Sequence, residues 1–185
     1  MGCVTSLDYS PAAARTDLLA PPVAAAVAAW AGRTPVDAIR VAEIDPELAD
    51  TAAFCAAYDE PLAESANCVV VHGRRGETVT PVACLVLATT RADVNGLVRR
   101  HVNARKASFA PMEEAVADTG MEYGGITPLG LPENYVLLVD PAVVASSRVV
   151  IGSGLRRSKV ELPGAAVAEI PGATVLPGLG LPVGG

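Results

Sequence analysis

The chain has 185 residues, enough for one domain, and 51% of them are hydrophobic, so a sizeable core can form. Only 4% are aromatic, so this core is expected to be aliphatic. The formal net charge of −6 argues against a strong non-specific nucleic-acid binder.

Charge is spread unevenly along the sequence. Residues 1–90 carry 5 basic and 11 acidic side chains, whereas residues 91–159 carry 9 basic and 7 acidic ones. The middle segment can therefore present a modest basic face, although scattered solvated charges would give the same balance.

Residues 1–44 are expected to form an N-terminal extension. Residues 1–21 are rich in proline and alanine and lack periodicity, which predicts a loose arm. The stretch PPVAAAVAAWAG, residues 21–32, predicts a short helix, because proline favours the first helical turn and glycine ends helices. The alternation in VDAIRVAEI, residues 36–44, indicates a possible strand.

The next part of the chain predicts a helix, a hairpin and a second helix. DPELADTAAFCAAY, residues 45–58, starts with Asp45 as a cap and Pro46 at the first helical position. NCVVVHG (67–73) and VTPVACLVLATT (79–90) are rich in valine and flank the turn RRGE, so they predict a hairpin of central strands. TRADVNGLVRRHV, residues 90–102, predicts a helix that begins near Thr90 or Asp93.

Shorter elements follow. KASFA (106–110), YVLLVD (135–140), RVVIGSG (148–154), SKVELPG (158–164) and ATV (173–175) predict strands. PMEEAVADTG (111–120), PAVVASS (141–147) and AAVAEI (165–170) predict helices, and residues 176–185 predict a flexible tail. This irregular interleaving favours an α/β fold, with a mixed sheet or barrel and helices outside it.

Familiar catalytic and metal-binding patterns are missing. The four cysteines form no CxxC pair and the sequence has no matching histidine spacing, so no metal site is expected. There is no G-x-S-x-G motif, and His72 and His101 are expected to be ordinary surface residues. No secretory signal or membrane-length apolar run is visible, so a cytoplasmic protein with reduced thiols and no membrane contact is expected.

The stretch TGMEYGGITPLGLP, residues 119–132, is the most unusual local feature. A Gly-Gly-x-x-Pro loop between a helix end and a strand can aim consecutive N–H groups at a carbonyl oxygen. Such donors stabilise an oxyanion without any side chain. A tight surface crossover would explain the same residues.

Two other stretches could contact an anion. GSGLRR, residues 152–157, can cradle a phosphate with main-chain N–H groups, or can simply form a hairpin turn. The basic pair Arg105–Lys106 can meet a phosphate backbone, or can be an ordinary exposed pair.

A longer pattern resembles a known family. RKASFAPMEEAVADTGMEYGGITPLGLPENYVLLVD (105–140), followed by VVIGSGLRRSKVEL (149–162), is similar to the YbaK/prolyl-tRNA editing domain family. The shared order is a basic residue before a short strand, a helix ending in Thr-Gly, and Gly-Gly-[IV]-[ST]-Pro-[LIF]-Gly. A strand ending in Asp and a glycine-containing strand pair follow. The resemblance covers about residues 45–175.

The resemblance implies a deacylase that hydrolyses the ester of mischarged tRNA in trans, commonly a small amino acid on tRNA for proline. It implies a barrel-like mixed sheet with flanking helices and no metal or organic cofactor. The implied partner is the acceptor end of aminoacyl-tRNA, and association with a synthetase or the elongation machinery is compatible with it. The oligomeric state stays open.

The resemblance also assigns site residues. Gly124 and Gly125 would shape the oxyanion loop, Ile126 and Thr127 would present main-chain groups to the carbonyl, and Pro128 would hold the shape. The matching positions for substrate binding are Lys106, Asp140, Gly152, Ser153 and Gly154, of which Asp140 can instead cap the helix after it. Candidates for contact with tRNA phosphates are Arg105, Arg156 and Arg157.

One position departs from the family pattern. Many members carry a lysine in the first central strand, where this sequence has Asn67. Asparagine keeps hydrogen-bonding capacity but loses the charge and reach of lysine. Asn67 is therefore expected to bind the aminoacyl end or the ribose. Two alternatives stay open: an inactive editing fold that binds aminoacyl-tRNA, a nucleotide or a protein, and a small-molecule ester or amide hydrolase.

Overall fold

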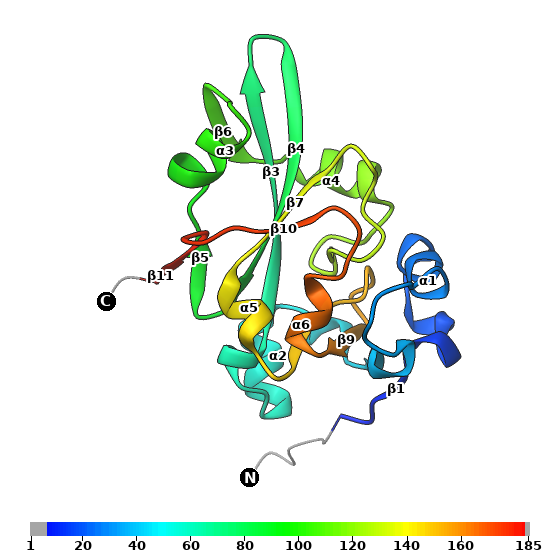
Figure 1. Cartoon of the computed structure of the whole chain (residues 1–185). Coiled ribbons are helices and arrows are strands. Elements are labelled where there is room, and N and C mark those ends of the chain that lie inside the picture. Colours follow the sequence, from blue (N-terminus) through cyan, green and yellow to red (C-terminus); the bar gives the residue numbers. More distant parts are fainter. Residues whose placement is uncertain (1–6, 184–185) are drawn as a thin grey trace.

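The computed structural model describes residues 7–183 and contains a mixed α/β fold (Figure 1). Its largest sheet has five strands in the order β10-β7-β4-β3-β6. The bounds are β3 (Ala66–Arg75), β4 (Thr78–Leu87), β6 (Lys106–Phe109), β7 (Val136–Val139) and β10 (Ala173–Val175). Strand β7 runs parallel to β4 and β10, whereas β3 is antiparallel to β4 and β6.

A second sheet has four antiparallel strands in the order β1-β2-β9-β8, and a third pairs β11 with β5. The bounds are β1 (Ser10–Pro11), β2 (Arg40–Glu43), β5 (Thr90–Ala92), β8 (Val149–Gly152), β9 (Ser158–Leu162) and β11 (Gly180–Pro182).

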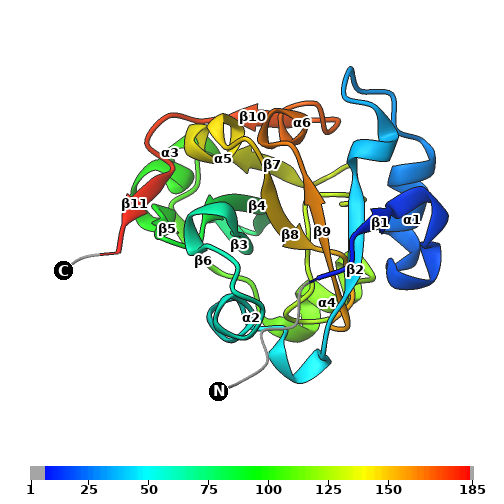
Figure 2. The same ribbon diagram turned by 90° about the horizontal axis from the view of Figure 1, so that it is seen from below.

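Short helices connect and cover these sheets: α1 (Pro21–Ala28), α2 (Thr51–Tyr58), α3 (Arg99–His101), α4 (Met112–Thr119), α5 (Pro141–Ala145) and α6 (Gly164–Val167). Figure 2 shows α1 beside the β1–β2 edge, with α5 and α6 packed together elsewhere. Asp50 begins α2 by accepting from the amide of Ala52 at 3.0 Å. Asp45, the expected cap, instead caps a 3₁₀ turn at Pro46–Leu48.

The sheets do not close into the barrel-like arrangement that the sequence predicts. Among residues 7–183, the four- and five-stranded sheets are joined by an isolated bridge between Ser65 and Val150. Strands β6 and β10 remain the edges of the larger sheet, so the ladder of hydrogen bonds that a barrel requires is not completed.

The N-terminal segment packs into the main core, although the sequence predicts a loose arm over residues 1–21. Leu18, Leu19 and Val23 are buried in the main core cluster, which also contains Ile151 of β8 and Val160 of β9. Strand β2 continues this attachment, because Arg40 to Glu43 pair with Glu161 to Ser158. Residues 1–6, which include Cys3, lie outside the described part of the chain.

Two other segments differ from expectation. The helix expected over residues 90–102 is divided into β5, a π-helical turn at Val94–Val98 and α3. Asp93 caps the π-helical turn through the amides of Gly96 and Leu97. The expected tail forms β11, and Leu179 just before it is fully buried.

Membrane-spanning helices are not found in the described chain: none of its helices is both long and apolar enough to cross a bilayer.

Leu18→Ala tests the packing of the N-terminal segment. Leu18 is 1% exposed within the main core, so the substitution should lower the free energy of unfolding by about 2–5 kcal/mol. Leu62→Ala is the control: Leu62 is 45% exposed, so this substitution should lower the free energy of unfolding only slightly. Urea unfolding followed by circular dichroism measures both, and equal effects would contradict the packing described.

Candidate functional site

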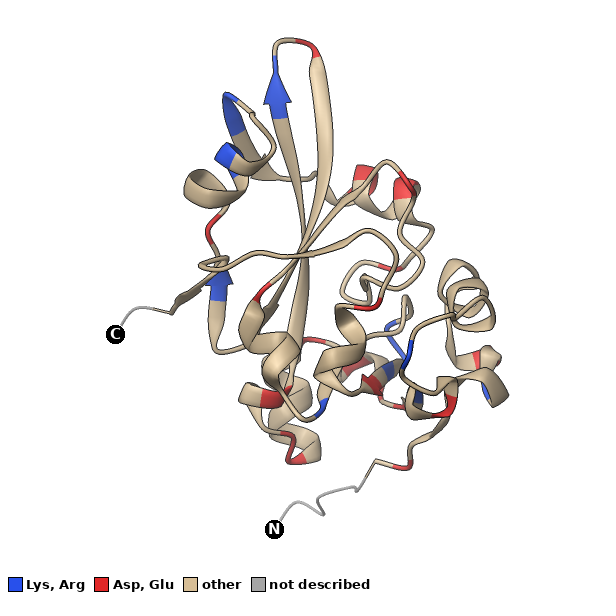
Figure 3. Ribbon diagram, in the orientation of Figure 1, with Lys and Arg blue, Asp and Glu red and all other residues tan. Residues whose placement is uncertain are grey.

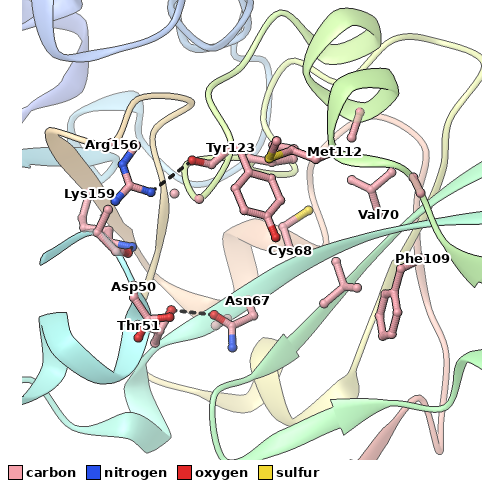
Figure 4. A pocket seen from close by; sticks show the side chains of 18 residues that line it. Asp50, Thr51, Asn67, Cys68, Val70, Phe109, Met112, Tyr123, Arg156 and Lys159 are labelled. Atoms are coloured by element: carbon pink, nitrogen blue, oxygen red, sulfur yellow. Dashed lines mark hydrogen bonds between the residues drawn. The ribbon is translucent and has the colours of Figure 1, made fainter. Parts of the chain in front are cut away.

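A cavity of about 440 Å³ lies where the start of β3 meets the starts of α2 and α4, the loop after α4, and the β8–β9 turn (Figure 4). Asn67, Gly124, Ile126, Gly152 and Arg156 all line it. The other lining residues are Ala49, Asp50, Thr51, Ala66, Cys68, Val69, Val70, Phe109, Ala110, Met112, Ala115, Tyr123 and Lys159. The fold thus brings together residues from segments far apart in the sequence.

Asn67 stands at the start of β3 and is held by α2. Its side-chain oxygen accepts a hydrogen bond from the Thr51 hydroxyl at 2.6 Å (Figure 4). The side-chain nitrogen of Asn67 makes no hydrogen bond with the described residues, so both of its N–H donors are left for a ligand. Strand β6 pairs with β3 only from Val71 to Arg74, which leaves the edge of β3 open at Asn67.

The loop after α4 is folded by its own main chain. The Gly125 amide donates to the Glu122 carbonyl at 2.9 Å, and the Gly125 carbonyl accepts from the Gly154 amide at 2.7 Å. The Thr127 amide points to the Met121 sulfur at 3.4 Å. The amides of Gly124 and Ile126 have no acceptor within residues 7–183, and both residues line the cavity. These two amides are therefore the candidate oxyanion donors.

Close packing fixes the loop against the end of β8. A Cβ atom on Gly152 would overlap the Gly125 carbonyl oxygen and lie 2.9 Å from the Ile126 carbonyl oxygen. A Cβ atom on Gly125 would lie 2.8 Å from the main chain of Leu155. Both positions therefore require glycine, because the backbones themselves are in contact.

Arg156 holds the other side of the loop. Its guanidinium donates to the Tyr123 carbonyl at 3.3 Å and to the Pro46 carbonyl at 3.0 Å, and its amide donates to the Glu122 carboxylate at 2.6 Å. Gly124 has a φ of +86°, a conformation that glycine adopts without strain. Arg156 thus positions the turn that carries the Gly124 amide.

Lys159 places a buried ammonium at the cavity. It lies opposite Gly152 in the β8–β9 pair, is 6% exposed, and donates to the Ala49 carbonyl at 2.9 Å. Its Nζ also lies 5.2 Å from the centroid of the Phe54 ring. Burial lowers the pKa of this ammonium. No described carboxylate forms an ion pair with it, so two of its three donors can serve a ligand.

Cys68 also lines the cavity, but it is a poor nucleophile. Burial raises the pKa of its thiol, so the thiol stays protonated near neutral pH. Burial likewise raises the pKa of Cys84 to about 12. Within residues 7–183, no group of three or more His, Cys, Asp or Glu side chains could hold a metal ion.

Other residues assigned from the sequence lie beneath or beyond the cavity. Thr127 is fully buried, and Pro128 lines a separate cavity beside Trp30. The Ser153 hydroxyl is buried 2.7 Å from the Ser158 hydroxyl, and Gly154 is buried behind the loop. Their contacts support the loop from behind.

Asp140 uses both carboxylate oxygens within the protein. One accepts from the Ala142 amide at 2.8 Å and caps α5, and the other accepts from the Gly180 amide at 2.5 Å. Asp140 is not among the residues that line the cavity, so its contacts are those of a helix cap that also holds β11.

The basic candidates are separated in space. Arg157 is exposed and donates to the Asp17 carbonyl at 2.6 Å. Arg105 and Lys106 are exposed beside the far end of β3, where Lys106 lies opposite Arg74. Neither of them lines the cavity that holds Asn67.

Sequence reasoning missed Thr51, Tyr123, Phe109 and Lys159, all of which line the cavity. A lysine inside the otherwise well-buried strand β9 was a usable signal for Lys159, since buried lysines are rare. Tyr123 and Phe109 are 58% and 68% exposed, which is unusual in a chain with so few aromatic residues.

The buried ammonium predicts how stability depends on pH. Its pKa is lowered from 10.5 in the folded state, so as pH rises the folded protein releases this proton before the unfolded chain does. The unfolded state then binds more protons, so wild-type stability rises relative to Lys159→Met over the pH range that ends at the unfolded pKa of 10.5. Lys106→Met is the control, because Lys106 is exposed. Urea midpoints measured across this range check the trend, and a pH-independent difference for Lys159→Met would contradict it.

Comparisons with known proteins identify the fold and the family of the chain. A crystal structure of a candidate trans-editing enzyme for prolyl tRNA synthetase superposes with a TM-score of 0.70 at 20% identity, covering 85% of this chain and 94% of that one. The crystal structure of a hypothetical protein superposes with a TM-score of 0.68 at 22% identity, covering 77% of this chain and 91% of that one. At these identities the likeness establishes the fold. The family model for the aminoacyl-tRNA editing domain matches residues 45–170, more than half of the sequence. The chain therefore belongs to the aminoacyl-tRNA editing domain family.

Proposed function

We propose that the chain hydrolyses, in trans, the ester that joins a wrong amino acid to the 3′-terminal adenosine of tRNA. The observation that carries this proposal is the convergence of Asn67, Gly124, Ile126 and Gly152 on one cavity. Its volume of about 440 Å³ suits a small aminoacyl group together with part of the ribose. We assign the editing domain to residues 45–175, with residues 10–43 completing its core.

The reaction needs positioning more than it needs a strong nucleophile, because an aminoacyl ester is already activated. Water, oriented by a neighbouring ribose hydroxyl, attacks the carbonyl carbon and gives up a proton, and the carbonyl oxygen becomes an oxyanion. The amides of Gly124 and Ile126 donate to that oxygen. Collapse of the intermediate breaks the ester bond, the ribose oxygen takes a proton, and the amino acid leaves.

Polar side chains orient the substrate in this scheme. The amide nitrogen of Asn67, fixed by the bond from Thr51, donates to the aminoacyl end or the ribose. Lys159 supplies the positive charge that the family lysine would bring at position 67, but from strand β9. Arg156 keeps the turn at Tyr123 and Gly124 in place.

The family and one fold neighbour support a choice of substrate. That neighbour is described as a candidate trans-editing enzyme for prolyl tRNA synthetase. We therefore propose tRNA for proline, charged with a small amino acid, as the first substrate to test.

Gly152→Ala tests the oxyanion loop. The added methyl group would overlap the Gly125 carbonyl and displace the two free amides, so deacylation should fall about 100-fold or more, the loss expected for one oxyanion donor. Gly172→Ala is the control: its φ of +78° makes the substitution strain the backbone, but a Cβ atom there meets nothing within 4 Å and so displaces no neighbour. Release of labelled amino acid from mischarged tRNA measures both. No turnover above buffer by the wild-type protein on any mischarged tRNA would refute the proposed activity.

A second candidate function is an inactive editing fold that binds aminoacyl-tRNA, and Asn67 is the observation that favours it. If activity has been lost with the lysine, Asn67→Lys should create turnover in a wild-type protein that has none. If the site has adapted, Asn67→Ala should abolish an existing activity, because the donors that Thr51 orients are removed. The two substitutions, assayed on the same mischarged tRNA, separate these functions.

A further inference from the structure

Positive charge is concentrated in one part of this acidic protein. Residues 74–106 carry 7 basic and 2 acidic side chains, a balance of +5, whereas the rest of the chain carries 7 basic and 18 acidic ones, a balance of −11. Figure 3 shows the basic residues of this segment on the far end of the β3–β4 hairpin, on the neighbouring α3 and β6, and on β5 below them.

The basic tip consists of Arg74, Arg75, Arg99, Arg100, Arg105 and Lys106. Arg74 lies directly opposite Lys106 in the β3–β6 pair, and the Arg105 amide donates to the Arg74 carbonyl at 2.8 Å. Arg75 donates to Asn103 in the turn after α3. The tip is therefore one surface built from three segments.

These charges are not neutralised by the protein. Arg99 is half-buried and the other five are exposed, and none of the six forms an ion pair with a described residue. Like charges opposite each other in a sheet destabilise it, as at Arg74 and Lys106. A surface that keeps unpaired cations at such a cost is suited to an external polyanion.

Strand β6 links the tip with the candidate site. A second cavity of about 610 Å³ shares Asn67, Val69 and Phe109 with the first and is also lined by Arg91 and Ser108. Strand β6 runs from Phe109 to Lys106, a distance of roughly 10 Å at the usual rise per residue. Phe109 stands between the cavities with its ring exposed, where a nucleobase can stack.

We propose that the basic tip binds the phosphate backbone of an RNA whose 3′ end crosses the second cavity at Phe109 and enters the first. This inference rests on the proposed function for the chemistry at the 3′ end. The RNA phosphates then contact the basic tip and not Arg156 and Arg157, whose guanidinium groups already donate to carbonyls of this chain. The six cations at the tip face the acceptor stem, and Arg156 positions the loop.

The test is a pair of matched double substitutions. Arg74→Ala with Lys106→Ala removes two charges from the tip, and Arg33→Ala with Arg157→Ala removes two exposed charges elsewhere. The probe is an uncharged RNA minihelix ending in CCA, with its affinity measured by fluorescence anisotropy over a series of KCl concentrations. The tip pair should weaken binding about tenfold or more and reduce the slope of log K against log[salt] by about 1.5, whereas the control pair should change little. Equal losses in both pairs, or no loss in the tip pair, would overturn the inference.

Further measurements separate this inference from the proposed function and test the role of Phe109. Hydrolysis of a short aminoacyl-adenosine ester should be unchanged in the tip pair, because that substrate does not reach the tip. If the protein binds the minihelix but hydrolyses no ester, the proposed activity is refuted and the RNA-binding role of the basic tip still stands. Phe109→Ala should weaken the minihelix that ends in CCA more than one that lacks it, and equal effects would contradict the path. Tip-dependent binding to anionic phospholipid vesicles without binding to RNA would also overturn the inference.

Discussion

The candidate site depends on the contact between two stretches of backbone, the loop at Gly124–Ile126 and the end of β8 at Gly152. The Gly154 amide donates to the Gly125 carbonyl, and neither Gly125 nor Gly152 has room for a methyl group. This contact holds the loop from behind, while the amides of Gly125 and Thr127 donate to acceptors within the loop. The amides of Gly124 and Ile126 are left free on the cavity side, where an anionic intermediate can use them.

The distribution of charge around the cavity follows from the same arrangement. Asn67 is neutral where many relatives carry lysine, yet a lysine reaches the cavity from β9, directly opposite Gly152. Its ammonium is desolvated and keeps unused donors, so it is suited to a ligand with an anionic or carbonyl group. Further along β3 and β6, the basic tip carries cations that form no ion pair with a described residue. Under the proposed function, the main-chain groups of the loop act on the ester, and the five arginines and Lys106 of the basic tip bind the RNA.

Local patterns predict much of this fold. Runs of valine predict β3 and β4, and Pro111 and Gly120 bound α4 as expected. The glycine-rich loop and Asn67 could be placed at one site only because the longer pattern resembles a family. The sequence predicts a barrel-like sheet, but the sheets stay open. The burial of Leu18 and the pairing of β11 with β5 could not be predicted either, because all three features depend on contacts between distant segments. Lys159 was missed because its place at the cavity depends on the contact of β9 with the chain near Ala49 and Asn67, which are distant in the sequence.

The most direct measurement of the central claim is an NMR titration with a non-hydrolysable, amide-linked aminoacyl-adenosine. If the loop amides receive the substrate carbonyl, the amide signals of Gly124 and Ile126 should shift most, together with the side-chain amide of Asn67. The Gly125 and Thr127 amides, which already have acceptors within the loop, should shift less. Shifts centred on the cavity beside Trp30 and Pro128, with Gly124 and Ile126 unaffected, would contradict the account.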